Sequence, residues 1–379
     1  MRNVLISGRL GRLAQLGERG VRNAEAEGSS PLPSIPNPMT KQKPHKAQRA
    51  PQAHKDHKAK LSAWWMLLVV GVLIGAIAYG MQGGRAAQAP APAPAAPAQS
   101  AARTSPFNAD RAFADLKTMV GFGPRPAGSE ALAKTRAYIV AELQKVGLKA
   151  ELDEFEAVTP RGRKKMTNIR ASRPGIRPGT IALVGHYDTK LFDNMTFVGA
   201  NDGGSSAAWV LEMARATQNL RLQNTLEFVF FDGEEAVVEW TDDDSVYGSK
   251  YDVARRIKAG TLAQLKALIL VDMIGDKSLA IQKEQQSTEW LTTTIWNTAR
   301  SLGYTKEFLN TEQPISDDHI PFLNARIPAV DLIDFDYGPG HTYWHQAGDT
   351  LDKTSGQSLK IVGDTVYLSL NEIDRRVSQ

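Results

Sequence analysis

Cysteine is absent from the 379 residues of this sequence. The chain therefore has no disulfide, no thiol nucleophile and no cysteine-ligated metal, so a bound metal could be held only by His, Asp or Glu. Hydrophobic residues are not scarce, since they make up 42% of the chain. This composition excludes a chain that is disordered throughout, and the length suits one large enzyme domain with appendages.

The net charge is small, at +4, and it is unevenly distributed. Residues 1–60 hold 12 Lys and Arg against 4 Asp and Glu, which leaves 33 basic and 37 acidic residues in the rest of the chain. The larger part of the chain is therefore acidic. This excludes the broad basic surface that nucleic-acid binding requires, so we expect no nucleic-acid partner.

An uncharged run, AWWMLLVVGVLIGAIAYGM, occupies residues 63–81. As a helix it would rise about 28 Å, enough to cross a membrane. Aromatic residues lie near both ends of the run, and the segment before it, residues 39–62, is rich in lysine. We expect one transmembrane signal anchor, with 39–62 as a basic cytoplasmic stub and the rest on the periplasmic side of a bacterial inner membrane. The alternative is a cleaved signal peptide, cut near Ala86–Ala89.

Two further segments lie outside the expected enzyme domain. Within residues 1–38, the stretch Gly11–Asn37 resembles the conceptual translation of a transfer-RNA gene, so we expect a mis-called start and a true start at Met39. A disordered cytoplasmic tail is the alternative. Residues 82–104 are rich in Ala and Pro, which favours an extended spacer between the membrane and the domain.

Residues 105–379 alternate between short apolar runs and helical patterns. Four runs of four to six residues are typical of buried strands: Ile181–Val184, Leu226–Phe231, Ala267–Val271 and Ala329–Ile333. Segments with helical spacing lie between them. This alternation predicts a three-layer α/β/α sandwich with a central mixed, largely parallel sheet.

Acidic and imidazole side chains follow these strands. They occur in Gly185-His186-Tyr187-Asp188, in the loop around Asp202, in Glu234-Glu235, at Asp272, in Asp317-Asp318-His319 and at His345. A single Asp after a strand is most often a turn or capping residue, and an isolated Glu pair is most often solvated. Several carboxylates at one sheet edge, however, are costly to bury without a cation. Oxygen and nitrogen ligands without sulfur favour a catalytic zinc.

The motifs GHYDT, GANDGG, FFDGEEA, VDMIGD, SDDHIPF and WH occur in this order, and the series resembles the zinc exopeptidase superfamily between Pro106 and Ile373. That superfamily includes leucyl-aminopeptidase-type enzymes with two zincs and glutaminyl-peptide cyclotransferases with one. The long insert between Glu235 and Ser249, which contains Trp240, resembles the cyclotransferases. The resemblance therefore implies the zinc exopeptidase-like fold and conversion of an N-terminal Gln of peptides or proteins to pyroglutamate, with release of ammonia.

The resemblance also implies a role for each matching residue. One Zn²⁺ would be held by Asp202, Glu235 and His345. Glu234 would transfer the proton, Asp272 and Asp317 would form an acidic hydrogen-bonded pair that helps to position it, and Trp240 and Trp344 would wall the substrate pocket. The chain departs from the animal enzymes at Asp331, where they have a histidine, and in the loop Asp334–Tyr343.

Two other functions stay open. In a two-zinc aminopeptidase, His186 and Asp272 would bind the second ion, Asp202 would bridge both ions, and Glu234 would activate water for peptide hydrolysis. A membrane-tethered binding protein on a degenerate peptidase scaffold is the third hypothesis. The presence of Glu234 and of all three implied ligands disfavours it.

Overall fold

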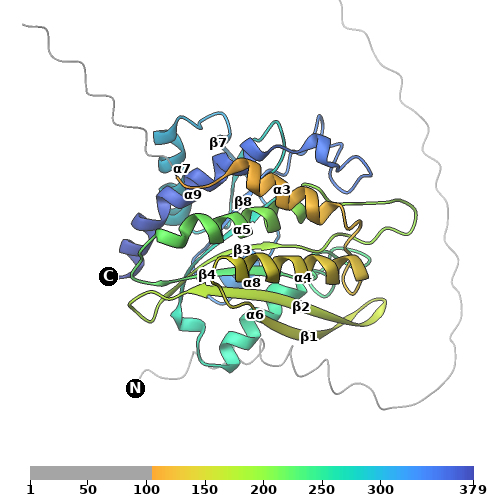
Figure 1. Ribbon diagram of the computed structural model, residues 1–379, viewed down its shortest axis with the longest axis horizontal. Helices are drawn as coiled ribbons and strands as arrows, with labels where there is room; N and C mark the ends of the chain where they lie inside the picture. Colours follow the sequence, from red (N-terminus) through yellow and green to blue (C-terminus); the bar gives the residue numbers. More distant parts are fainter. Residues whose placement is uncertain (1–104) are drawn as a thin grey trace, which may run out of the picture. The chain divides into compact units, whose positions relative to one another are not determined.

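Four parallel strands form the centre of the sheet in the computed structural model, which describes residues 105–379 (Figure 1). The strand order is β1-β2-β4-β3-β5-β8, and β1 and β2 extend the sheet in antiparallel fashion. The strands are β1 (Glu151–Thr159), β2 (Gly162–Arg173), β3 (Thr180–His186), β4 (Thr225–Phe231), β5 (Leu265–Asp272) and β8 (Ala329–Ile333). The predicted mixed, largely parallel sheet is confirmed.

Helices cover both faces of the sheet. The strands alternate their side chains between the two faces, as the two-residue period requires. On one face, Leu183, Phe228 and Ile269 belong to the larger core, which also contains side chains of the helices α3 (Ala109–Val120), α4 (Glu130–Lys145), α5 (Gly204–Ala216), α7 (Glu289–Leu302) and α9 (Gly356–Val377). The other face packs against α6 (Tyr247–Lys258) and α8 (His319–Asn324). Helix α5 lies directly over β3 and β4, almost entirely buried (Figure 1).

A cluster of buried charges joins α3, α4 and α5. The guanidinium group of Arg215 forms ion pairs with Asp115, with Glu142 at 2.8 Å and with Glu212 at 3.2 Å. Arg111 completes the cluster by donating two hydrogen bonds to Glu212. The side chain of Glu212 is fully buried, so its charge requires these partners.

Three parts of the described chain were not among the predicted elements. They are the hairpin of β1 and β2, the short helix α8, and a small parallel sheet of β6 (Ile281–Glu284) and β7 (Phe308–Gln313). The predicted membrane span, residues 63–81, lies outside the described residues. Within residues 105–379, no helix combines the length and the apolar character that crossing a membrane requires.

Candidate active site

The chemistry-bearing residues meet at the carboxyl ends of the parallel strands. His186 is the last residue of β3 and Asp272 the last of β5, while Glu234 and Glu235 follow β4 after two residues. Asp202 precedes the N-terminus of α5. Parallel pairing of β3 with β4 and β5 places these strand ends side by side, which is why residues far apart in the chain share one site.

Asp202, Glu235 and His345 offer three ligand atoms that lie within 4.8 Å of one another. His345 Nε2 is 3.3 Å from Asp202 Oδ2 and 3.3 Å from Glu235 Oε1. Asp202 Oδ2 and Glu235 Oε2 are buried and accept no hydrogen bond. Carboxylate oxygens that are buried in this way are costly unless a cation compensates them, so the set fits a divalent ion such as Zn²⁺.

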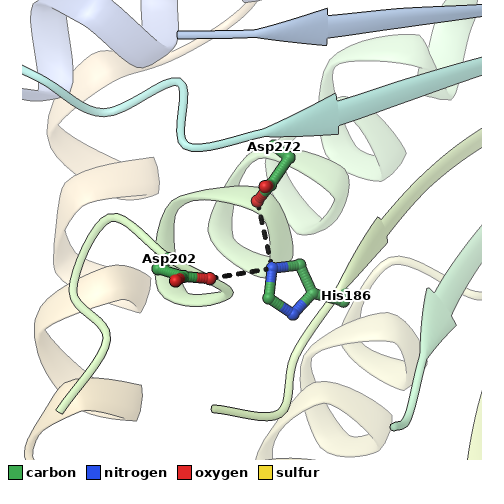
Figure 2. Close-up of side chains that lie close together, drawn as sticks. All are labelled: His186, Asp202 and Asp272. Atoms are coloured by element: carbon green, nitrogen blue, oxygen red, sulfur yellow. Dashed lines mark hydrogen bonds and ion pairs between the residues drawn. The ribbon is translucent and has the colours of Figure 1, made fainter. Parts of the chain in front are cut away.

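A second group lies beside the first and shares Asp202 with it. His186 Nε2 is 3.0 Å from Asp272 Oδ1 and 3.3 Å from Asp202 Oδ1, as Figure 2 shows. The three ligand atoms again lie within 4.8 Å of one another. Asp202 therefore faces a histidine on each side, which is the arrangement that the two-zinc alternative requires.

The electrostatics of these groups favour a cation. Burial opposes ionisation of Asp202, but the imidazole groups of His186 and His345, each 3.3 Å from one of its oxygens, lower the pKa of its carboxyl group. Burial likewise acts against the charge on His345, yet Glu235 and Asp202 raise its pKa to about 10. Without a metal, protonated histidines thus balance the carboxylates. A metal ion would replace those protons.

Glu234 lies against this centre without belonging to either ligand group. It is 6% exposed, and its Oε2 is 3.8 Å from His186 Nδ1. Burial raises the pKa of its carboxyl group well above the ordinary value, and the charges of Asp317 and Glu235 raise it further. The Asp188 carboxylate fixes the turn by accepting the N–H groups of Glu234 and Glu235. A buried carboxyl group with a raised pKa is suited to proton transfer near neutral pH.

Asp272 and Asp317 lie close together but are not hydrogen-bonded to each other in the described structure. Asp272 Oδ1 accepts hydrogen bonds from Ser206 Oγ and the Met273 N–H and lies within hydrogen-bond distance of His186. Burial and then the charge of Asp272 raise the pKa of Asp317 to about 7. Asp317 Oδ2 has no partner. The two carboxyl groups thus interact through charge.

Aromatic rings surround His345. Trp344 stacks on it with ring centroids 4.1 Å apart, and Phe335 contacts Trp344 at 5.0 Å. Phe192 lies edge-on to the His345 ring at 5.8 Å. Trp240 is 39% exposed, so it is not an ordinary core residue. Trp344 therefore lies beside the ligand groups, whereas the exposed side chain of Trp240 makes no aromatic contact with this cluster among residues 105–379.

Arg125 was not predicted to belong to the site. It is fully buried, and it donates to main-chain carbonyl groups: Val198 at 2.7 Å, Gly199 at 2.8 Å and Tyr187 at 3.3 Å. Burial lowers its pKa to about 10, while Asp349, Asp188 and Asp202 act in the opposite direction. Arg125 therefore brings a positive charge to the acidic site and holds the loop that leads to Asp202.

Asp349 and Gly203 also position Asp202. Gly203 belongs to the GANDGG motif, whereas Asp349 lies in no motif of the series. The Asp349 carboxylate accepts the N–H groups of Asn201 at 2.8 Å and Asp202 at 3.1 Å. Gly203 has φ 78°, and a Cβ atom there would lie 2.3 Å from the Asp188 carbonyl oxygen. No motif marks Asp349 because it acts through the backbone.

Asp331 lies behind the site on β8. It is fully buried, and both of its carboxylate oxygens lack hydrogen-bond partners. Its nearest basic group is His319, whose Nδ1 is 3.7 Å from Asp331 Oδ2 and whose Nε2 is 3.0 Å from Glu284 Oε2. The position that departs from the animal enzymes therefore contacts a buried His–Glu pair.

The sequence matches peptidase family M28 over residues 168–370. A solved glutaminyl cyclase from an Acidobacteriales bacterium is 37% identical, with a TM-score of 0.69, and the alignment covers 75% of this chain and 100% of that one. The glutaminyl-peptide cyclotransferase of Bos taurus is 30% identical over 62% of this chain and 75% of its own length. A Zn-dependent exopeptidase from Parabacteroides distasonis is 29% identical with a TM-score of 0.63, covering 71% of this chain and 99% of that one.

Proposed function

The chain belongs to peptidase family M28, and we propose that it is a zinc-dependent glutaminyl-peptide cyclotransferase. It converts the N-terminal glutamine of peptides to pyroglutamate and releases ammonia. The observation that carries the proposal is the likeness to the solved Acidobacteriales glutaminyl cyclase over that protein's whole length. The site supports it, because a three-ligand group, the adjacent buried Glu234 and Trp344 lie together.

Asp202, Glu235 and His345 would hold the zinc ion. When bound, zinc supplies a Lewis acid that polarises the γ-carbonyl group of the substrate glutamine. The protein itself must bind the substrate and hold its amine close to its γ-carbonyl group. Because amine and carbonyl belong to one molecule, a pocket that holds the folded-back side chain supplies much of the acceleration. Trp344 and Trp240 would form its walls.

Glu234 would move the proton. The substrate α-amine attacks the γ-carbonyl carbon, and the bond from that carbon to the side-chain nitrogen breaks as the lactam closes. The amine loses one proton to the Glu234 carboxylate, and the departing nitrogen takes one from it, so ammonia leaves and Glu234 regains its first state. Burial and the charge of Asp317 raise the pKa of this carboxyl group, and Asp272 would act indirectly because its charge raises the pKa of Asp317.

One observation favours the aminopeptidase as a second candidate. The group of His186, Asp202 and Asp272 provides ligands for a second ion, and Glu234 lies beside it. Incubation with Gln-β-naphthylamide and Leu-p-nitroanilide separates the two functions. Ammonia release from the first without cleavage of the second supports the cyclase. The reverse result, with two zinc ions per chain in active protein, would reject it.

We further propose, from the sequence alone, that residues 63–81 anchor the enzyme and place residues 105–379 outside the cytoplasm. The uncharged run and the lysine-rich segment before it support this. Protease treatment of spheroplasts provides the test, because an extracytoplasmic domain should be digested while the outer face is exposed. Full protection in intact spheroplasts, with digestion only after lysis, would reject this orientation.

A further inference from the structure

A cavity of about 320 Å³ lies at the end of the sheet opposite the active site. Its lining includes Arg173, the last residue of β2, and Gln223, which comes shortly before β4 begins. The parallel strand β3 starts at this end and finishes at His186 in the active site. A strand of that length spans about 20 Å, so the cavity is separate from the catalytic centre.

Two arginines in this cavity lack an acidic partner. Nη2 of Arg173 donates to the Ala214 carbonyl at 2.8 Å, but its Nε is buried and has no partner. Arg221 makes only long contacts with the carbonyl groups of Gln218 and Leu220. Burial and the neighbouring charge of Arg221 both lower the pKa of Arg173. The Asp374 carboxylate forms no ion pair with either arginine within residues 105–379, and its oxygens accept the N–H groups of Gln223 and Asn224.

An exposed apolar side chain lies at the rim of the cavity. Ile176 is 80% exposed in the loop Pro174–Gly179, and Arg177 follows it. The loop is held in place, since the N–H groups of Ile176 and Arg177 both donate to the Gln223 carbonyl at 2.8 Å. The protein therefore presents a large aliphatic group to solvent on a fixed backbone, beside guanidinium groups that have no acidic partner among the described residues; Arg177 donates to the Ser378 carbonyl. Basic groups next to an exposed aliphatic side chain suit the interface of an anionic membrane.

We propose that this basic face, formed by Arg173, Ile176, Arg177 and Arg221, docks onto an anionic phospholipid membrane. A headgroup phosphate enters the cavity between Arg173 and Arg221, and Ile176 inserts among the headgroups. Guanidinium groups suit phosphate oxygens, and the apolar cavity walls strengthen that interaction by excluding water. This docking proposal is independent of the proposed cyclase function. It depends on the proposed anchor in one respect only, because the anchor determines which membrane the basic face meets.

The segment before the domain permits this contact. Residues 82–104 lie between the proposed span and the domain, and an extended Ala/Pro-rich chain of that length reaches up to about 70 Å. Docking through the basic face points the opposite end of the sheet, with its carboxylates, away from the bilayer. Peptide N-termini then reach the active site without approaching the lipid.

Vesicle co-sedimentation of residues 105–379 tests the proposal. This segment encloses its own core, and a chain portion of comparable extent matches a solved cyclase over its full length. We expect binding to vesicles with 30% phosphatidylglycerol and none to pure phosphatidylcholine. Since a basic residue at an anionic surface contributes roughly fivefold in affinity, Arg173→Gln/Arg221→Gln should bind about 25-fold more weakly. Ile176→Ser, at an exposed position that leaves the fold intact, should bind about tenfold more weakly.

Controls at the hairpin of β1 and β2, at the other end of the sheet, remove either equal charge or another exposed aliphatic side chain, Val158 being 55% exposed against 80% for Ile176. Arg163→Gln/Lys165→Gln and Val158→Ser should bind as the unchanged domain does. Equal losses in these controls, or no binding of the unchanged domain to anionic vesicles, would overturn the proposal. Saturable binding of inorganic phosphate without vesicle binding would also overturn it, in favour of a soluble anion. Cyclisation activity of each variant, measured in parallel, should be unchanged, which separates this proposal from that of the enzyme.

Discussion

Buried carboxylates occur in two regions of the domain, and their partners differ. Between α3, α4 and α5, Asp115, Glu142 and Glu212 are each paired with an arginine. At the carboxyl ends of the strands, one oxygen each of Asp202, Glu235 and Asp317 is buried without a hydrogen bond, and none of the three is paired with an arginine within residues 105–379. The ion-pair contacts of Asp202 and Glu235 are with histidines and, at 3.8 Å, with Lys190. The first arrangement is complete within the protein. The second leaves charge that a metal, a proton or a substrate must balance, so the absence of partners marks the reactive region.

The strongest test of this comparison is Glu234→Gln. The amide cannot accept the substrate proton, so we expect kcat to fall about 1,000-fold, within the range of general acid–base catalysis. Zinc content, measured by mass spectrometry of the native protein, should stay the same because Glu234 belongs to neither ligand group. Loss of zinc in this variant would show that the assignments of Glu234 and Glu235 are wrong.

The next test compares the same substitution in the two regions. Glu235→Gln should lower zinc affinity by more than about 100-fold, because removal of a residue that merely orients a ligand already costs 10–100-fold. His345→Ala should do likewise. Competition with a chelator measures both affinities.

Glu212→Gln is the matched control in the arginine-paired region. It breaks a buried ion pair and should lower the free energy of unfolding by about 3 kcal/mol, as measured with urea, with zinc affinity unchanged. If Glu212→Gln weakened zinc binding, or Glu235→Gln affected only stability, the two regions would not differ as described.

Arg125 provides a smaller test, because it is an arginine inside the acidic region. Arg125→Met frees the carbonyl groups of Val198 and Gly199 and removes a positive charge near Asp202, so we expect about tenfold weaker zinc binding. Arg215→Met, in the helical cluster, should reduce stability but leave zinc affinity unchanged. Chelator competition and urea unfolding of both variants decide whether Arg125 acts on the site or only on the fold.

The smallest expected effect concerns pH. Burial raises the pKa of Asp334, just after β8, from 3.8 to about 7. A folded-state pKa above the unfolded one means that this group's contribution to stability is present below about pH 4 and is lost as pH rises through 7. Asp334→Asn resembles the protonated carboxyl group, so the variant should be about 1–3 kcal/mol more stable than the parent at pH 8 and similar at pH 4. Urea unfolding at both pH values measures this, and an unchanged difference between them would contradict it.

The sequence predicted the central strands and the convergence of the ligands well, for a physical reason. Strands buried on both faces are continuous apolar runs, as at Ala267–Val271, and the carboxyl ends of parallel strands share one edge. His186 and Asp272 could therefore be placed together before any coordinates were known. The hairpin of β1 and β2 lacks such a run, because many of its side chains are charged and exposed.

The supporting residues of the site could not be predicted. Arg125 and Asp349 contact main-chain groups around Asp202, and a backbone contact leaves no residue pattern to read. The hydrogen-bonded pair of Asp272 and Asp317 stays a prediction, because it depends on a proton shared between two carboxyl groups. Which oxygen meets which donor depends on side-chain positions within a few tenths of an ångström, and residue types do not specify these.

The spacing of the three ligands along the chain has a consequence for biosynthesis. Asp202, Glu235 and His345 come from distant segments, and Asp349 must be in place to hold the Asp202 loop. A growing polypeptide cannot retain the ion until nearly all of the enzyme has left the ribosome. Under the proposed zinc assignment, metal loading is thus a late event in maturation.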